Sequence, residues 1–155
     1  MNNLILIGFK SAGKTTLGKR VAAKLRRPFI DTDTLFDAPP AELYRNLGPN
    51  LFRAQEKKLL LTLAPITNHV IATGGGTPCD PESAQFLRQL GLVIHLQTPK
   101  TVIEERLGLL PPPPCLQGDS FERLYAERLS TYIKVAHHTF ITEAEIWKFL
   151  FNVTR

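Results

Sequence analysis

The chain has 155 residues, a length that suggests one domain large enough to bury its own core. Hydrophobic residues make up 43% and charged residues 21%, as in ordinary soluble globular proteins, and no apolar run approaches the length of a membrane span. The formal net charge of +5 is scattered along the chain, which favours an anionic small molecule over nucleic acid as the partner. We expect a monomer that binds neither nucleic acid nor a membrane.

The N-terminus and the cysteines indicate the compartment. Residues 1–4 carry no positively charged side chain ahead of their short apolar run, so we expect no signal peptide. Cys79 and Cys115 lie far apart and match neither a metal-ligand spacing nor a C-x-x-C motif, which favours thiols in a reducing environment. We therefore predict a cytoplasmic protein.

A phosphate-binding loop is predicted at residues 8–15, where GFKSAGKT fits the pattern G-x-x-x-x-G-K-[ST]. The apolar run 4–7 before it predicts a buried strand, and residues 14–25 after it have the periodicity of a helix. This context favours a nucleotide site over a chance match, because backbone N–H groups and the helix N-terminus can converge on phosphate. Lys14 would reach the β- and γ-phosphates and Thr15 would contact Mg²⁺. The expected ATP-binding residues of this region are Ser11, Ala12, Gly13, Lys14, Thr15 and Thr16.

Two aspartates, Asp31 and Asp33, lie at the end of the next predicted strand. Strand, loop, helix and strand in this order imply a parallel βαβ unit, so Asp31 and Asp33 should face the same crevice as Lys14. The two aspartates could instead cap the following helix. A kinase site, however, needs one carboxylate near its metal and another that orients or deprotonates the acceptor hydroxyl. We assign Asp31 to the first role and Asp33 to the second.

Arg53 lies near the start of a helix predicted at residues 51–63, which Gly48-Pro49 separates from a helix at 41–47. A cation is unfavourable at the start of a helix because the helix dipole is positive there. Arg53 therefore either has an anionic partner at the site or is an ordinary surface residue, and the sequence leaves both open.

Three consecutive glycines, 74–76, follow a strand predicted at residues 69–72. Glycines cost backbone entropy on folding, so they should serve either a tight turn or the close approach of a ligand. We favour a ligand, because this turn should lie at the same edge of the sheet as the phosphate loop.

The remainder of the chain continues the alternation of helices and strands. The predicted elements are a helix at 81–90, a strand at 92–96, helices at 100–107 and 119–136, a strand at 139–142 and a helix at 143–153. His95 lies between apolar neighbours on a strand and is interpreted as structural. The four prolines 111–114 exclude a helix or a central strand, so residues 108–118 form either a lid over the site or a surface linker.

Taken in order, these motifs resemble those of the shikimate kinases, which share the P-loop fold of nucleoside monophosphate kinases. The matching features are the phosphate loop, the Asp31-Thr32-Asp33 strand end, Phe52-Arg53 with Glu56, the Gly74–Gly76 turn, Arg106, and Arg128 with Tyr132. The resemblance implies a three-layer α/β fold with a five-stranded parallel sheet. It also implies a single domain, residues 1–155, with a lid at about 108–118 and a substrate-binding helical segment at about 33–63.

The resemblance also implies the reaction and its residues. ATP, with Mg²⁺ held near Thr15 and Asp31, would phosphorylate the 3-hydroxyl of shikimate to give shikimate 3-phosphate and ADP. Lys14 and Asp33 would be catalytic, and Arg106 would join the ATP site. The residues implied to hold shikimate are Asp33, Arg53, Gly74, Gly75, Gly76 and Arg128. Two arginines suit a carboxylate, and Asp33 suits ring hydroxyls.

The chain departs from the family pattern in its lid, and the segments between Asp33 and Arg53 and between the lid and Arg128 are also shorter than usual. The family's lid usually contains an Arg-Pro-Leu-Leu-like segment whose arginine contacts ATP, whereas the comparable stretch here is Pro113-Pro114-Cys115-Leu116. Lys10, Arg106 or Arg123 could supply the charge instead, and the sequence does not decide among them.

Two other functions compete with this interpretation. The first is a kinase of the same fold with another acceptor, such as gluconate or a nucleoside monophosphate. The second is a regulatory module that binds nucleotide without catalysis. Asp33 with Arg53 and Arg128 argues for a hydroxylated acid as acceptor, and Lys14, Thr15, Asp31 and Asp33 together argue for catalysis.

Overall fold

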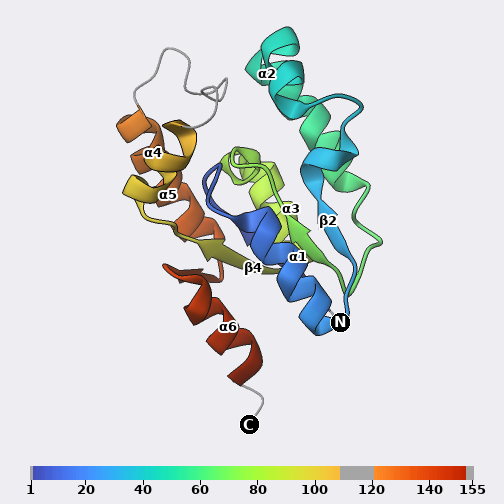
Figure 1. Cartoon of the computed structure of the whole chain (residues 1–155). Coiled ribbons are helices and arrows are strands. Elements are labelled where there is room, and N and C mark those ends of the chain that lie inside the picture. Colours follow the sequence, from blue (N-terminus) through green and yellow to red (C-terminus); the bar gives the residue numbers. More distant parts are fainter. Residues whose placement is uncertain (1, 109–120, 153–155) are drawn as a thin grey trace.

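Five short strands pair in parallel to form one sheet in the order β2-β3-β1-β4-β5. The strands are β1 (Asn3–Ile7), β2 (Phe29–Asp31), β3 (Val70–Ala72), β4 (Gly91–Leu96) and β5 (His138–Phe140). This computed structural model describes residues 2–108 and 121–152 (Figure 1). The predicted α/β fold with a five-stranded parallel sheet is therefore confirmed.

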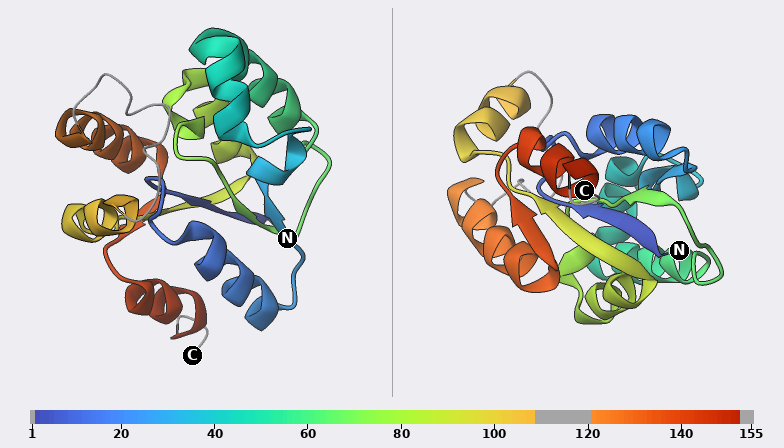
Figure 2. Two further views of the ribbon diagram at one scale, coloured as in Figure 1. Left: turned by 45° about the horizontal axis from the view of Figure 1, so that its top comes forward. Right: turned by 90° about the horizontal axis from the view of Figure 1, so that it is seen from below.

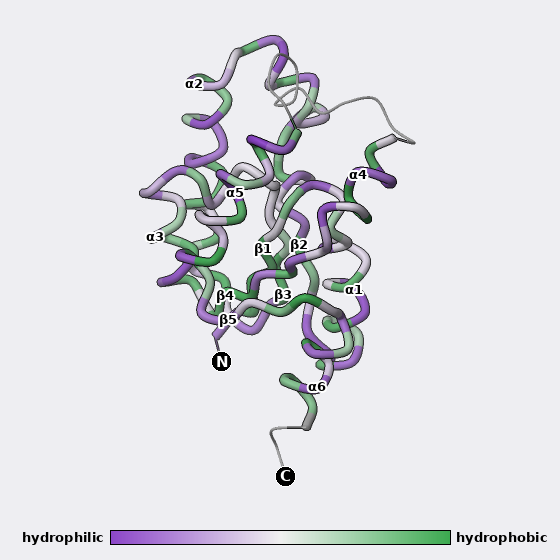
Figure 3. Tube along the Cα trace, turned by 90° about the vertical axis from the view of Figure 1, so that its left-hand side faces the viewer, coloured by the Kyte–Doolittle hydropathy of each residue, from purple (hydrophilic) through white to green (hydrophobic). Residues whose placement is uncertain are grey.

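Helices cover both faces of the sheet, because alternate residues of the central strand β1 are apolar on both sides. Leu4 and Leu6 pack with α1 (Lys14–Leu25) and α6 (Glu143–Asn152). Ile5 and Ile7 lie in a second cluster. That cluster draws on α2 (Pro40–Leu61), α3 (Pro81–Leu90), α4 (Lys100–Gly108) and α5 (Phe121–Val135). The result is a three-layer arrangement (Figure 2), and hydrophobic residues lie along the strands at its centre (Figure 3).

Helix α2 contains the break that the sequence predicts at Gly48-Pro49. Gly48 has φ 79° and ψ 168°, outside the helical region, and Pro49 has no N–H to donate to the preceding turn. The first part of α2 is thereby redirected relative to the second, which begins near Leu51 and runs to Leu61. Both parts contribute side chains to the cavity described below.

Several element boundaries differ slightly from the prediction, and two short 3-10 helices were not expected. Strand β5 begins at His138 and ends at Phe140, whereas we expected a strand at 139–142, because pairing with β4 fixes its start opposite Ile94. A short 3-10 helix, η1 (Thr32–Leu35), follows β2 and had no periodic signal. A second one, η2 (Thr77–Cys79), follows the glycine turn.

The C-terminal ends of β1, β2 and β3 meet at one edge of the sheet, where parallel strands of this kind bind ligands. These ends lead into the phosphate loop, Asp31 and the glycine turn respectively. The predicted lid at 108–118, apart from Gly108, lies outside the described residues, as does Cys115. Within residues 2–108 and 121–152, no helix combines the length and apolar composition that crossing a membrane requires.

Candidate active site

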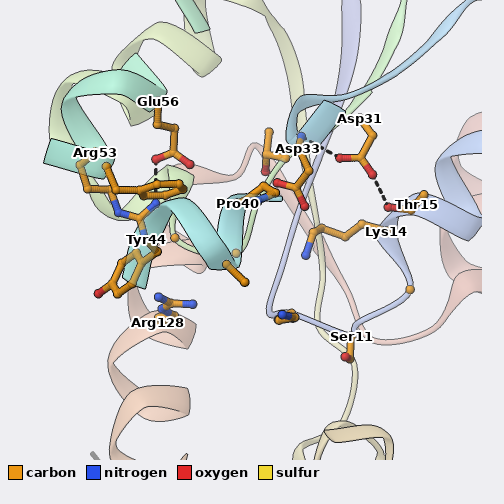
Figure 4. A pocket seen from close by; sticks show the side chains of 18 of the residues that line it. Ser11, Lys14, Thr15, Asp31, Asp33, Pro40, Tyr44, Arg53, Glu56 and Arg128 are labelled. Carbon is orange, nitrogen blue, oxygen red and sulfur yellow. Dashed lines mark hydrogen bonds and ion pairs between the residues drawn. The ribbon is translucent and has the colours of Figure 1, made fainter. Parts of the chain in front are cut away.

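A cavity of about 340 Å³ opens at this edge of the sheet, between the phosphate loop and α2 (Figure 4). It brings together residues from β1–α1, β2, α2, the β3–η2 turn and α5. The lining residues are Lys10, Ser11, Gly13, Lys14, Thr15, Thr16, Asp31, Asp33, Pro40, Ala41, Tyr44, Phe52, Arg53, Glu56, Thr73, Gly74, Gly75, Gly76 and Arg128. All the predicted site residues except Ala12 and Arg106 therefore line this one cavity.

The phosphate loop has the conformation that its glycines make possible. Gly13 immediately precedes α1 with φ 101°, a value that L side chains rarely adopt. Lys14 is buried, and its Nζ donates hydrogen bonds to the carbonyl oxygens of Gly8, at 2.7 Å, and Phe9, at 2.9 Å. Burial lowers the pKa of Lys14 to about 8, although Asp33 and Asp31 partly oppose this shift. The ammonium group is thus held in the loop with incomplete charge compensation.

Ala12 and Arg106 support the loop from behind. Ala12 is buried, and its carbonyl oxygen accepts a hydrogen bond from Thr98 Oγ1 at 2.7 Å. Arg106 Nη1 donates to the carbonyl oxygen of Ser11 at 2.7 Å, so its guanidinium group lies against the loop. The side chain of Arg106 is exposed and does not line the cavity.

Thr15 and Asp31 form the pair to which the sequence assigned Mg²⁺. Thr15 Oγ1 donates to Asp31 Oδ2 at 2.8 Å, and Asp31 Oδ1 accepts from the backbone N–H of Asp33 at 3.0 Å. Asp31 therefore also caps η1, as the alternative interpretation of the sequence predicted. A hydroxyl and a carboxylate are hard oxygen ligands that fit Mg²⁺, which is usually bound by one or two protein groups with phosphate and water. Residues 2–108 and 121–152 contain no group of three or more histidine, cysteine, aspartate or glutamate side chains placed to hold a metal ion.

Asp33 faces Lys14 across the cavity, and their side chains extend towards one another (Figure 4). The surrounding protein raises the pKa of the Asp33 carboxyl, first by removing water and then through the negative charge of Asp31. Lys14 opposes this effect. A carboxylate with a raised pKa accepts a proton more readily, which suits a general base.

Arg53 has an anionic partner within the protein. Its Nη1 contacts Glu56 Oε1 at 2.7 Å, and Glu56 Oε2 accepts a hydrogen bond from Thr77 Oγ1 at 2.8 Å. The guanidinium group also lies 5.1 Å from the ring centroid of Phe52 and 5.9 Å from that of Tyr44. These contacts hold Arg53 at the cavity wall and explain its position near the start of a helix.

The glycine turn accommodates this arginine. A methyl group at Gly76 would overlap with the Arg53 guanidinium, although the backbone of Gly76, at φ −89° and ψ −9°, is one that any residue adopts. The sequence favoured a ligand as the reason for the three glycines. At Gly76 the reason is the protein's own side chain.

Arg128 approaches the same turn from α5. Its Nη1 lies 3.3 Å from the position that a Cβ at Gly75 would occupy, and its guanidinium carbon lies 5.6 Å from the Phe9 ring centroid. Tyr132 Oη, one turn further along α5, donates to the carbonyl oxygen of Gly75 at 2.5 Å. Arg53 and Arg128 thus lie on the same side of the cavity (Figure 4).

Sequence reasoning missed several lining residues. Pro40, Ala41 and Tyr44 come from the first part of α2, and no motif marked them. Tyr44 packs edge-on against Phe52, at 5.4 Å between ring centroids, across the break at Gly48. This contact depends on the bend of α2 at Gly48, and no local motif marked Tyr44 as a lining residue.

A phosphate loop at a parallel sheet edge, with two carboxylates and two arginines across the cavity, defines a P-loop kinase of small molecules. A family model described as shikimate kinase matches residues 10–152. The chain belongs to the shikimate kinase family. A shikimate kinase from Pelotomaculum thermopropionicum is 38% identical over 146 residues, which are 89% of this chain and 84% of that protein.

A solved structure agrees with this assignment. The shikimate kinase from Acinetobacter baumannii in complex with shikimate superposes with a TM-score of 0.87 at 29% identity, covering 99% of this chain and 95% of that one. A gluconokinase from Sinorhizobium meliloti matches with a TM-score of 0.58 and 16% identity, over 99% and 98% of the two chains. The latter likeness concerns the fold alone.

Proposed function

We propose that this protein transfers the γ-phosphoryl group of ATP to the 3-hydroxyl of shikimate, giving shikimate 3-phosphate and ADP. The observation that carries the proposal is the order of groups across one cavity. The phosphate loop with Lys14 lies at one side, Arg53 and Arg128 at the other, and Asp33 is close to Lys14. A hydroxylated carboxylic acid bound by the arginines would present a hydroxyl to Asp33, next to the terminal phosphate.

The nucleotide side of the cavity would bind phosphate through the loop backbone and the N-terminus of α1. Lys14 would exchange its two carbonyl partners, Gly8 and Phe9, for β- and γ-phosphate oxygens. Thr15 and Asp31 would hold Mg²⁺ directly or through water, and the ion would offset phosphate charge when bound. Arg106 would contribute by fixing the carbonyl of Ser11 and, with it, the shape of the loop.

The acceptor side would bind through charge and shape. Two guanidinium groups can engage a carboxylate by paired hydrogen bonds, and both are held in place by aromatic rings. Asp33 would orient the reacting hydroxyl and take its proton, consistent with the raised pKa of its carboxyl. Because phosphoryl transfer needs little covalent chemistry from the protein, positioning and charge stabilisation would supply most of the rate.

The proposal is tested by ADP release in a coupled assay with Mg·ATP and one acceptor at a time: shikimate, gluconate or a nucleoside monophosphate. We expect release that depends on shikimate and falls at least about 100-fold in Arg128→Ala, because a charged clamp on the substrate is lost. Lys134→Ala, an exposed site on the same helix, is the matched control. ADP binding without release for any acceptor would favour the regulatory-module alternative. Release with gluconate or a nucleoside monophosphate instead would identify a different kinase.

We also propose that the protein acts as a monomer in the cytoplasm. The described residues of one chain include candidates for both the nucleotide side and the acceptor side of the cavity, and the proposed reaction consumes ATP. Light scattering during gel filtration should give the mass of one chain, 17.4 kDa. A dimer mass that persists on dilution would contradict the first part of this proposal.

A further inference from the structure

Positively charged side chains outnumber negatively charged ones around the cavity. Among the lining residues are four cations, Lys10, Lys14, Arg53 and Arg128, and three carboxylates, Asp31, Asp33 and Glu56. Glu56 pairs with Arg53, and Asp31 accepts hydrogen bonds from Thr15 and Asp33.

Lys10 differs from the other three cations. Lys14 is bonded to loop carbonyls, Arg53 to Glu56, and Arg128 packs on Phe9. Lys10 is exposed, and neither a hydrogen bond nor an ion pair engages its side chain within the described part of the chain. It also lies close enough to Lys14 for the two positive charges to disfavour one another. The repulsion between the two ammonium groups has an energetic cost in the empty protein. An anion bound between them would be attracted by both, so the net electrostatic interaction would become favourable.

The backbone places Lys10 where the two halves of the cavity meet. Its N atom lies 3.2 Å from the position that a Cβ at Gly75 would occupy, so the phosphate loop and the glycine turn touch at this residue. Arg128 Nη1 lies 3.3 Å from the same position. The positive charge of Lys10 acts on Lys14, on the nucleotide side, and on Asp33, on the acceptor side. Lys10 therefore lines the cavity at the point where the phosphate loop lies against the glycine turn.

We propose that Lys10 is a further catalytic residue, whose ammonium group binds the oxygens of the phosphoryl group while it is transferred. This inference rests on the proposed function. In the step, the bond between the γ-phosphorus and the β,γ-bridging oxygen breaks, and its electron pair stays on ADP. A new bond forms between the γ-phosphorus and the acceptor oxygen, whose proton passes to Asp33. Lys10 forms no covalent bond and stabilises charge on the three oxygens that move with the phosphorus.

The role predicts a specific division of kinetic effects. An interaction made mainly during transfer lowers kcat and leaves ground-state binding nearly unchanged. In Lys10→Met, we expect kcat to fall by roughly 100-fold, the lower end of the range for the loss of one well-placed donor to a developing charge. The KM for shikimate and the Kd for ADP should each change by less than about threefold. Lys10→Arg should retain most of kcat because it keeps the charge.

The matched control is Lys24→Met, which removes one exposed positive charge from α1 away from the cavity. It should leave kcat and both binding constants unchanged. A kcat of Lys10→Met within about twofold of the wild-type value would overturn the inference. A loss of ADP affinity as large as the loss of kcat would overturn it too, because Lys10 would then be a ground-state nucleotide ligand.

A second measurement separates this inference from the proposed function. ADP with aluminium fluoride and Mg²⁺ mimics a phosphoryl group in transit, and its binding can be measured calorimetrically with and without shikimate. The Lys10→Met variant should bind this mimic about tenfold or more weakly than the wild-type protein does, and should bind ADP almost normally. If the wild-type protein fails to phosphorylate shikimate but the Lys10→Met variant shows this selective loss, the proposed acceptor is wrong and the role of Lys10 stands. Equal binding of the mimic by both proteins would refute the role of Lys10 even if shikimate is the acceptor.

Discussion

The buried ammonium of Lys14 should make nucleotide affinity depend on pH. Burial lowers the pKa of Lys14 to about 8 in the empty protein, and bound phosphate, being anionic, should raise it again. Below pH 8, Lys14 is already protonated and ADP binding takes up no proton at this site. Above pH 8, binding must first restore the proton, so ADP affinity should fall by up to about tenfold per pH unit.

Calorimetry in buffers of different ionisation enthalpy checks this prediction. Proton uptake on ADP binding should be near zero at pH 7 and should approach one at pH 9. Lys14→Arg is the control, because arginine keeps its charge over this range and its affinity should vary little with pH. An ADP affinity of the wild-type protein that is constant from pH 7 to pH 9.5 would contradict the lowered pKa.

A second prediction at the scale of one residue concerns Ser11 in the phosphate loop. Ser11 has φ 66°, a left-handed conformation that costs a non-glycine residue about 1–2 kcal/mol. Glycine avoids this cost, but its greater loss of backbone entropy on folding offsets part of the gain. Ser11→Gly should therefore raise the free energy of unfolding by roughly 0.5–1 kcal/mol, measured by urea denaturation. Asn68, at φ 60°, is the control. Asparagine tolerates this conformation, so Asn68→Gly should gain less, and a destabilised Ser11→Gly would show that the Ser11 side chain stabilises the loop.

The residues of the phosphate loop could be predicted because the chemistry of phosphate binding is encoded in a contiguous motif. Asp31 and Asp33 could be placed because a strand end directs them to the same edge of the sheet. The reason for Gly76 could not be predicted, because it depends on Arg53, which lies on another element and meets the turn only after folding. The partner of Arg53 was also hidden, although Glu56 is only three positions away, since an i,i+3 pair is not distinguished from a surface pair by spacing.

At the scale of elements, the glycine turn and α2 meet where Gly76 lies against the side chain of Arg53. A methyl group at Gly76 would overlap with the Arg53 guanidinium, whereas the backbone there suits any residue. Gly76→Ala should therefore displace Arg53 without straining the turn. We expect the KM for shikimate to rise about tenfold or more, as when one charged contact to a carboxylate is lost, with ADP affinity unchanged.

A double-mutant cycle tests whether the effect passes through Arg53. The double variant Gly76→Ala with Arg53→Ala should be no worse for shikimate than Arg53→Ala alone, because the alanine at position 76 then meets no guanidinium. Additive losses in the KM for shikimate would mean that Gly76 acts independently of Arg53, for example by direct contact with the acceptor.

The elements themselves were predictable to different degrees. Helices with an apolar stripe and strands with continuous burial were found near their observed positions, as for α3 at Pro81–Leu90. Strand β5 was misplaced because its residues, His138 to Phe140, are only partly buried or exposed and carry no strong alternation. Its start is fixed by pairing with β4, a tertiary contact that no local pattern records. The break in α2 was found because Gly48-Pro49 is a local backbone signal.

At the scale of the whole molecule, His95 links core packing to acid stability. It is 2% exposed on strand β4, with its ring centroid 5.1 Å from that of Tyr132. Burial, with a smaller effect from Lys14, lowers the pKa of His95 to about 4. In the unfolded chain this pKa returns to about 6.5, so between these values the unfolded state binds the proton that the folded state resists.

The sign follows from this difference. Above pH 6.5, His95 is neutral in both states and makes no pH-dependent contribution, and below that pH the folded state loses stability. The loss should approach about 1.4 kcal/mol per pH unit and reach roughly 3 kcal/mol near pH 4. In His95→Gln, which cannot be protonated, the free energy of unfolding should start lower at pH 7 because the core is altered. It should then fall less steeply towards pH 4.

Urea denaturation of both proteins from pH 7.5 to pH 4 isolates the effect. The other titrating groups, including the carboxyls that protonate in this range, are common to both chains, so they cancel in the difference between the two curves. That difference should shrink as pH falls below 6.5, because only the wild-type protein loses the contribution of a neutral buried imidazole. Parallel curves would mean that His95 is protonated as easily in the folded state as in the unfolded one, and that the sheet opens to admit its charge.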